Sequence, residues 1–145
     1  MALRRSSHNV YDTQYHLVWA PKYRKKILTG AVNERMRELL LEIADSYRIE
    51  VDELEVSVDH VHVFCSFPPK LSITQVVTLW KSLSARAIFG EYPKLRRQLW
   101  GGEFWEDGYF VRTVGDRITA EVIKRYIQNH RDDSAQDLQL KLFDT

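Results

Sequence analysis

The sequence predicts an α+β fold in which an antiparallel sheet is covered on one face by two helices. Two observations predict it: short segments alternate apolar and polar residues, and longer segments between them repeat apolar residues at helical spacing. A chain of 145 residues with 44% hydrophobic residues can bury one core. We therefore expect a single domain over residues 1–145, with a looser C-terminal tail over residues 131–145.

Three segments alternate with the period of a strand. Residues 11–19 place their odd-numbered side chains on one face and end at the basic stretch APKYRKK. Residues 53–58 alternate acidic or polar side chains with apolar ones, which predicts a strand with one wet face. VHVFCSF, residues 61–67, continues as a strand. A turn near Asp59 would make the last two antiparallel neighbours, and one long strand is the alternative.

Two segments show the spacing of helices. Apolar residues between 32 and 47 recur at intervals of three and four. Ser72 and Gln75 form a capping box, and the helix that follows ends at the residues GEYP.

The remaining segments complete the order of elements. GGEFWEDGYFVRTVG, residues 101–115, is β-like with an Asp107-Gly108 turn signal inside it. Asp116 then caps a last helix, DRITAEVIKRYIQNH. The resulting order, β-α-β-β-α-β-α, matches the split βαβ plan, ferredoxin-like or RRM-like, with an additional C-terminal helix. Proteins with this fold have many different functions, so the fold alone does not predict the function.

The composition excludes a membrane span and favours the cytoplasm. Charges interrupt every apolar run, and MALRRSSHNV has no apolar stretch after its arginines, so we expect no span and no secretory signal. The single Cys65 cannot form an internal disulfide, which fits a reducing compartment.

Basic residues gather in two separate places although the net charge is only +1. Residues 1–26 carry six basic residues against Asp12, and a second cluster comprises Lys94, Arg96 and Arg97. Separated basic patches can bind phosphates. The plainer interpretation of each is a solvated surface.

The stretch DHVHVF, residues 59–64, carries the first chemical signal. His60 and His62 are two apart, so in a strand they point to one side while Val61 and Val63 point to the core. Two imidazoles held side by side suit a divalent metal. The alternative is two ordinary strand histidines bonded to neighbours or water.

The last predicted helix carries the second signal. Tyr126 and His130 are four apart and share a helical face with Ile118 and Val122. Packed on the sheet, this face could bring both residues to the histidine pair. Alternatively, Tyr126 is a core aromatic and His130 is a C-terminal dipole cap.

Four motifs, in order, resemble the single-tyrosine HUH transposases of small bacterial and archaeal insertion sequences. They are YHLVWAPKYRKKIL, DHVHVF, FWEDGYFVRTVG and VIKRYIQNH, and they cover roughly residues 10–131. The resemblance implies that the chain is one HUH transposase domain and that His60 and His62 are its catalytic histidine pair. It also implies that Tyr126 is the nucleophile and that His130 takes the third metal-ligand position, where glutamine is more usual.

The resemblance implies a metal-dependent enzyme that excises and inserts an insertion sequence by cutting and rejoining single-stranded DNA. Tyr126 would form a 5′-phosphotyrosine bond and free a 3′-hydroxyl. The implied metal is Mg or Mn, held by His60, His62 and His130, although three imidazoles alone would suit Zn or Mn better.

The expected partners are single-stranded DNA, with hairpin ends of the element, and a second copy of the chain. Aromatic residues lie within both basic stretches, a mixture that suits backbone contacts with base stacking. The candidate DNA-binding residues are Lys22, Tyr23, Arg24, Lys25, Lys26, Arg96 and Arg97. The resemblance implies a homodimer, and Gly115 would let the Tyr126 helix sit in cis or in trans.

Three other functions remain open on the sequence. One is a domesticated HUH endonuclease acting on repeats or origins. Another is a non-catalytic nucleic-acid-binding module, because RNA-recognition domains share the strand and helix order. Those domains use K/R-G-F/Y-type strands, which this chain lacks. A small metal-binding protein is the third, and it leaves the basic patches without a role.

Overall fold

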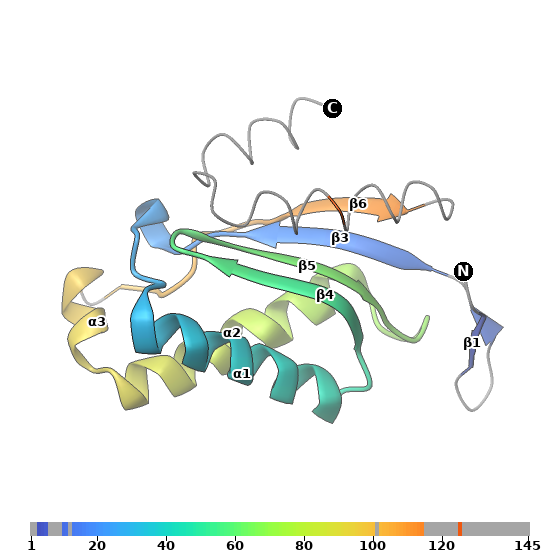
Figure 1. Cartoon of the computed structure of the whole chain (residues 1–145), viewed down its shortest axis with the longest axis horizontal. Helices are drawn as coiled ribbons and strands as arrows, with labels where there is room; N and C mark the ends of the chain where they lie inside the picture. Colours follow the sequence, from blue (N-terminus) through green and yellow to red (C-terminus); the bar gives the residue numbers. More distant parts are fainter. Residues whose placement is uncertain (1–2, 6–9, 12, 101, 115–124, 126–145) are drawn as a thin grey trace.

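The computed structural model describes residues 3–5, 10–11, 13–100, 102–114 and 125. A four-stranded antiparallel sheet, in the order β4-β5-β3-β6, has helices α1 and α2 along one face (Figure 1). The bounds are β3 Gln14–Trp19, α1 Gly30–Ser46, β4 Glu50–Ser57, β5 His60–Ser66, α2 Ile73–Glu91 and β6 Phe110–Val114. This arrangement confirms the split βαβ prediction.

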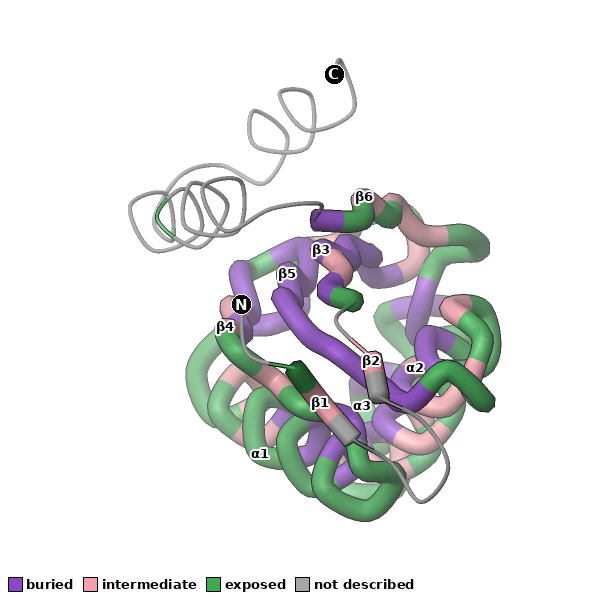
Figure 2. The backbone as a smooth tube through the Cα atoms, turned by 90° about the vertical axis from the view of Figure 1, so that its right-hand side faces the viewer, coloured by how far each residue is buried: buried purple, intermediate pink, exposed green. Residues whose placement is uncertain are grey.

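Alternation along the strands divides the sheet into two faces. Leu17 pairs with Val63 and Trp19 with Val61, and these four side chains belong to the core shared with α1 and α2. Because successive strand residues point to opposite faces, the even-numbered residues of β3 and β5 point away from those helices. Figure 2 shows that β5 is nonetheless buried along its whole length.

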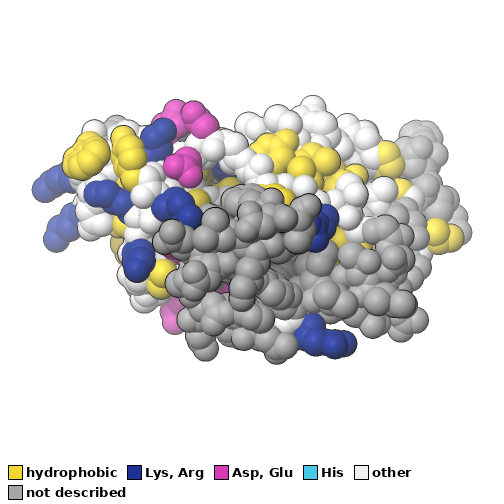
Figure 3. All heavy atoms as spheres, turned by 90° about the horizontal axis from the view of Figure 1, so that it is seen from above, with side chains coloured by type: hydrophobic (Ala, Val, Ile, Leu, Met, Phe, Trp, Pro, Cys, Tyr) yellow, Lys and Arg dark blue, Asp and Glu magenta, His cyan; other side chains and the backbone are white. Residues whose placement is uncertain are grey.

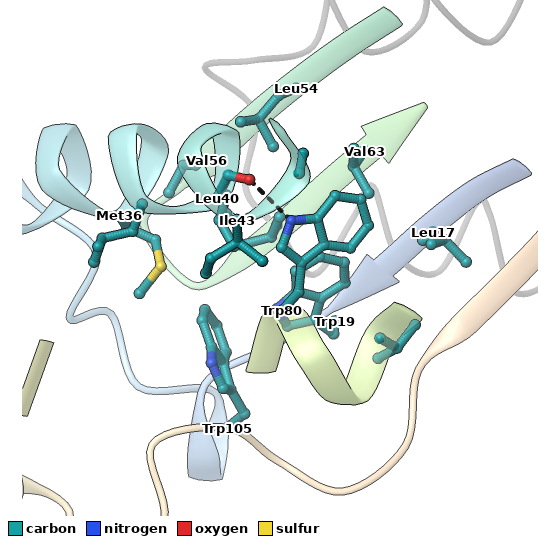
Figure 4. Packing of buried hydrophobic residues seen from close by; sticks show 14 of the residues in the cluster. Leu17, Trp19, Met36, Leu40, Ile43, Leu54, Val56, Val63, Trp80 and Trp105 are labelled. Carbon is teal, nitrogen blue, oxygen red and sulfur yellow. Dashed lines mark hydrogen bonds between the residues drawn. The ribbon is translucent and has the colours of Figure 1, made fainter. Parts of the chain in front are cut away.

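Tryptophans bind α1, α2 and the sheet together on the helical side. The Trp80 indole Nε1 of α2 donates to the Leu40 carbonyl oxygen of α1 at 2.9 Å (Figure 4). Its ring stacks on Trp19 of β3 with ring centroids 5.6 Å apart. Trp105 donates from its own Nε1 to Ser84 Oγ at 3.0 Å. These buried donors are therefore satisfied, and both helices are held against the strands that carry the histidines.

Several predicted details are confirmed. A turn at residues 58–59 joins β4 to β5 as antiparallel neighbours, so the alternative of one long strand is wrong. The Ser72 capping box is present, with both of its reciprocal hydrogen bonds, and α2 ends at Glu91. The helix predicted between residues 32 and 47 is α1.

Other details differ from the predictions. The first alternating segment is split: β3 begins only at Gln14, while β2 (Val10–Tyr11) pairs with β1 (Arg4–Arg5) in a separate two-stranded sheet. Arg4 also forms ion pairs with Glu50 and Asp52, which attaches that sheet to the start of β4.

The predicted β-like stretch over residues 101–115 forms a regular strand only at β6. Before it, Trp105 makes an isolated bridge with Pro21, because the backbone N–H groups of Lys22 and Glu106 donate to the carbonyl oxygens of Phe104 and Ala20. A short helix α3 (Lys94–Gln98) and a 3₁₀ turn η1 (Lys22–Arg24) were not predicted. Apart from Arg125, the last predicted helix, with Tyr126 and His130, and the tail lie outside the described residues.

Candidate functional site

His60 and His62 lie side by side on the face of the sheet that points away from α1 and α2. Their ring centroids are 4.3 Å apart, with the rings nearly perpendicular. Both side chains are fully buried. Strand β5 places them there because its other face must present Val61 and Val63 to the core.

Each of the two rings is held through its Nδ1 atom. His60 Nδ1 donates to Asp59 Oδ1 at 3.1 Å, and His62 Nδ1 lies 3.2 Å from His16 Nε2. The Nε2 atoms of His60 and His62 are buried and have no hydrogen-bond partner among the described residues. Buried polar atoms are rarely left without a partner, and within the described residues both Nε2 atoms remain available to a ligand.

His16 of β3 is a member of the cluster that sequence reasoning missed. Its ring stacks on His62 with centroids 5.4 Å apart, and it is fully buried. The available signal was its even position in β3, which places it on the side opposite Leu17 and Trp19. Which strand would lie beside β3, and in what register, could not be deduced from that signal.

Burial keeps two of these imidazoles neutral near pH 7. Burial, with a smaller contribution from the nearby Arg112 charge, lowers the pKa of His16 to about 4. Burial also holds the pKa of His62 well below its ordinary value, with smaller contributions from His60 and His16. Neutral imidazole is the form that can offer a lone pair to a metal ion.

The two predicted basic clusters come together at one end of the molecule. Lys22, Tyr23 and Arg24 form η1, directly after β3. The Lys25 ammonium donates to the Gln98 carbonyl oxygen at the end of α3, at 2.6 Å. The sequence placed these clusters about 70 residues apart and gave no sign that they would meet.

The individual basic residues have different surroundings. Arg24 Nη2 lies 3.9 Å from Asp59 Oδ2, so η1 reaches the residue that orients His60. The Arg96 guanidinium lies over the Phe89 ring, 4.5 Å from its centroid, and borders a cavity of about 510 Å³ beside α2. Lys26 and Arg97 are exposed.

The described residues do not by themselves form a metal site. Among them, no group of three or more His, Cys, Asp or Glu side chains could hold an ion. His60 and His62 offer two neutral nitrogen donors, while His16 Nε2 is turned to His62. The predicted third ligand, His130, and the predicted nucleophile, Tyr126, lie outside the described part of the chain.

Within the described part of the chain, none of the helices has the length and apolar character needed to cross a membrane.

Two solved structures share this fold. A protein of Deinococcus radiodurans R1 assigned as a transposase superposes with a TM-score of 0.71 and 36% identity, over 87% of this chain and 96% of that one. A REP-associated tyrosine transposase bound to a REP hairpin superposes with a TM-score of 0.62, over 92% of this chain and 75% of that one. Its identity is 14%, so it supports the fold alone. The fold is thus one that transposases use.

Sequence comparisons give the family. The model of the family described as "Transposase IS200 like" matches residues 9–130. The ISDra2 transposase TnpA of Deinococcus radiodurans is 36% identical over 132 residues, covering 91% of this chain and 94% of that protein. The transposase for insertion sequence element IS200 of Salmonella typhimurium is 29% identical, covering 94% and 88%. The chain therefore belongs to the IS200-like transposase family, as its motifs predicted.

Proposed function

We propose that the protein is a single-tyrosine HUH transposase that cuts and rejoins single-stranded DNA through a covalent bond to Tyr126. The observation that carries this proposal is the pair of buried Nε2 atoms of His60 and His62, which have no partner among the described residues while both Nδ1 atoms are engaged. The family match supports the same conclusion.

The donor set fits a divalent ion. Both histidines can present an Nε2 lone pair on one side. The Asp59 carboxylate accepts from His60 Nδ1–H and so leaves the His60 Nε2 lone pair free, and His62 presents its Nε2 lone pair when its Nδ1–H donates to His16 Nε2. We propose His130 as the third ligand and Mg or Mn as the metal. When bound, the ion supplies Lewis-acid polarisation of the target phosphate.

The covalent step exchanges one phosphate ester for another. The Tyr126 hydroxyl loses its proton and its oxygen attacks phosphorus in line, while the bond from phosphorus to the 3′ oxygen breaks. The departing oxygen takes up a proton and becomes a 3′-hydroxyl, and the 5′ end stays on Tyr126. Attack by another 3′-hydroxyl reverses these changes and rejoins DNA without ATP.

The proposed substrate is single-stranded DNA carrying a hairpin near the end of an insertion sequence. The hairpin is what the resemblance of the motifs implies, and a transposase of similar fold has been solved bound to a REP hairpin. We further propose that two copies of the chain act together, as a homodimer.

A covalent-adduct assay tests the proposed function. The protein is incubated with Mg²⁺ or Mn²⁺ and single-stranded ends of the element, and the products are separated under denaturing conditions. We expect a protein–DNA adduct that mass spectrometry maps to Tyr126. Binding without any adduct would instead favour a non-catalytic nucleic-acid-binding module.

A further inference from the structure

We propose that Tyr23 and Trp100 form a stacking platform for an unpaired base of single-stranded DNA. This inference rests on the proposed function and adds to it a place, outside the histidine site, where the DNA strand would be held. Tyr23 belongs to η1 and Trp100 follows α3. Figure 3 shows Lys and Arg side chains gathered with hydrophobic ones at the left end of the molecule, where α3 lies in Figure 1.

The two rings contact each other and remain open to solvent. Their centroids are 5.2 Å apart, and the ring planes are tilted by 52°. Tyr23 is 54% exposed and Trp100 is 75% exposed, the highest value among the large hydrophobic side chains of the described residues. The other three tryptophans, Trp19, Trp80 and Trp105, are buried. An exposed tryptophan paired with a second ring leaves an aromatic surface to which a base can add.

The backbone holds both aromatic residues in a conformation that side chains disfavour. Tyr23, Arg24 and Trp100 have φ values of 60°, 50° and 56°, in the left-handed region. Among the described non-glycine residues, only Arg48 shares this feature. Such conformations cost free energy and tend to occur at ligand-binding sites. Three of these conformations occur at one platform. Burial of the Trp100 ring does not offset their cost, because that ring is exposed, and this favours a binding role.

Positive charge surrounds the platform. The Lys25 ammonium lies 4.9 Å from the centroid of the Trp100 ring, and the Lys22 ammonium lies 5.9 Å from that of Tyr23. Lys26 and Arg97 are exposed on the same two segments. Cations placed around exposed rings match a ligand that combines aromatic bases with a phosphate backbone.

Arg24 connects the platform to the histidine site. Its Nη2 lies within ion-pair distance of Asp59, which orients His60. The Arg24 Nε and Nη2 atoms are buried and have no hydrogen-bond partner among the described residues. Guanidinium donors are well suited to phosphate oxygens. A strand with one base on the Tyr23 and Trp100 rings would therefore offer its next phosphates to Arg24, toward the histidines.

The occupant is an unpaired base, because both faces of a base in a duplex are already covered by its neighbours. The probes are a mixed-sequence oligodeoxynucleotide, its abasic analogue of equal length and charge, and the matching duplex. Affinity is measured by fluorescence anisotropy at one fixed salt concentration. Intrinsic fluorescence gives a second signal, because Trp100 is the one exposed tryptophan of the four.

We expect Trp100→Ala and Tyr23→Ala each to weaken binding of the base-bearing strand by about 5- to 100-fold. Trp100→Phe should keep most of the affinity. Tyr47→Ala, which removes an exposed aromatic ring at the end of α1, should change nothing. The wild-type preference for bases over the abasic strand should vanish in Trp100→Ala, together with quenching of tryptophan fluorescence by DNA.

Unchanged affinity in Trp100→Ala, or equal affinity of the wild type for both single strands, would overturn the platform. An equal loss of affinity for the duplex in Trp100→Ala would also overturn it. So would a variant that keeps its affinity for DNA and loses self-association, as measured by size-exclusion chromatography. These results are independent of the adduct at Tyr126. A missing adduct contradicts the proposed catalytic function, while base-dependent binding still decides the platform.

Discussion

His16 Nε2 of β3 lies 3.2 Å from His62 Nδ1 of β5. In the pairing of these strands Val18 lies opposite His62, so His16 is its diagonal neighbour. On the neighbouring histidine, Asp59 has the same role, since its carboxylate accepts from His60 Nδ1. His60 and His62, two of the three proposed metal ligands, therefore each have one protein partner on the Nδ1 side. Such partners fix the tautomer and the ring orientation of metal-binding histidines.

Removal of the His16 partner should weaken metal binding without removing a ligand. We expect His16→Phe, which keeps an aromatic ring of similar shape, to lower the affinity for Mn²⁺ by about 10- to 100-fold. His16→Gln can still accept from His62 and should recover part of this loss. Isothermal titration calorimetry with Mn²⁺ measures both variants, after a thermal melt confirms that they fold. Wild-type affinity in His16→Phe would show that His16 does not position His62.

Tyr126→Phe should abolish cleavage and the covalent adduct while leaving DNA binding within about twofold of the wild type. The change removes one hydroxyl oxygen, and with it the nucleophile. Denaturing gels measure cleavage and adduct, and anisotropy measures binding. Tyr47→Phe, at an exposed tyrosine outside the proposed site, is the matched control and should cut normally. A Tyr126→Phe protein that still cuts would contradict the assignment of the nucleophile.

Mixed dimers should reveal whether Tyr126 acts in its own subunit or in the partner's. His60→Ala alone should lose metal-dependent cleavage, because it removes one ligand, and Tyr126→Phe alone should also be inactive. When the two are refolded together, a trans arrangement gives one site with an intact histidine pair and an intact tyrosine, and activity returns. A cis arrangement leaves both sites defective. Cleavage by His60→Ala in the presence of chelator would argue against any metal role.

DNA affinity should fall as salt rises, because phosphate contacts release counterions. For single strands the slope of log K against log salt is about −0.7 per phosphate neutralised. Arg97→Ala should make the slope shallower by about 0.7 if that side chain contacts one phosphate. Lys70→Ala removes the same charge after the far end of β5 and should leave the slope unchanged. An affinity indifferent to salt would exclude the basic residues from binding.

Ser72→Ala should destabilise the fold by about 1 kcal/mol without affecting the chemistry. Ser72 Oγ accepts from the Gln75 backbone N–H, at an exposed helix start outside the histidine cluster. Urea denaturation measures the change in free energy of unfolding. Ser82→Ala, in the middle of the same helix, is the control and should be neutral or slightly stabilising because alanine favours a helix. Equal stability of the two variants would mean that the cap contributes nothing.

The sequence by itself determined the elements whose causes are local. Period two along residues 60–66 placed His60 and His62 on one face, because the pleat of a strand requires it. Ser72 and Gln75 marked the start of α2, because their side chains and backbones bond reciprocally within one turn. The same locality explains the error at the first strand, since the alternation of residues 11–19 contained no sign that Tyr11 would pair with Arg4.

Only the tertiary structure decided which distant residues meet. His16 reaches His62 because β3 lies beside β5 in one particular register, and a shift of one residue would turn His16 to the helices. Tyr23 reaches Trp100 because η1 and the end of α3 lie together, with Lys25 bonded to Gln98. Both contacts join segments far apart along the chain, so they depend on packing free energy summed over the whole core. A local pattern of residues therefore cannot predict these two contacts.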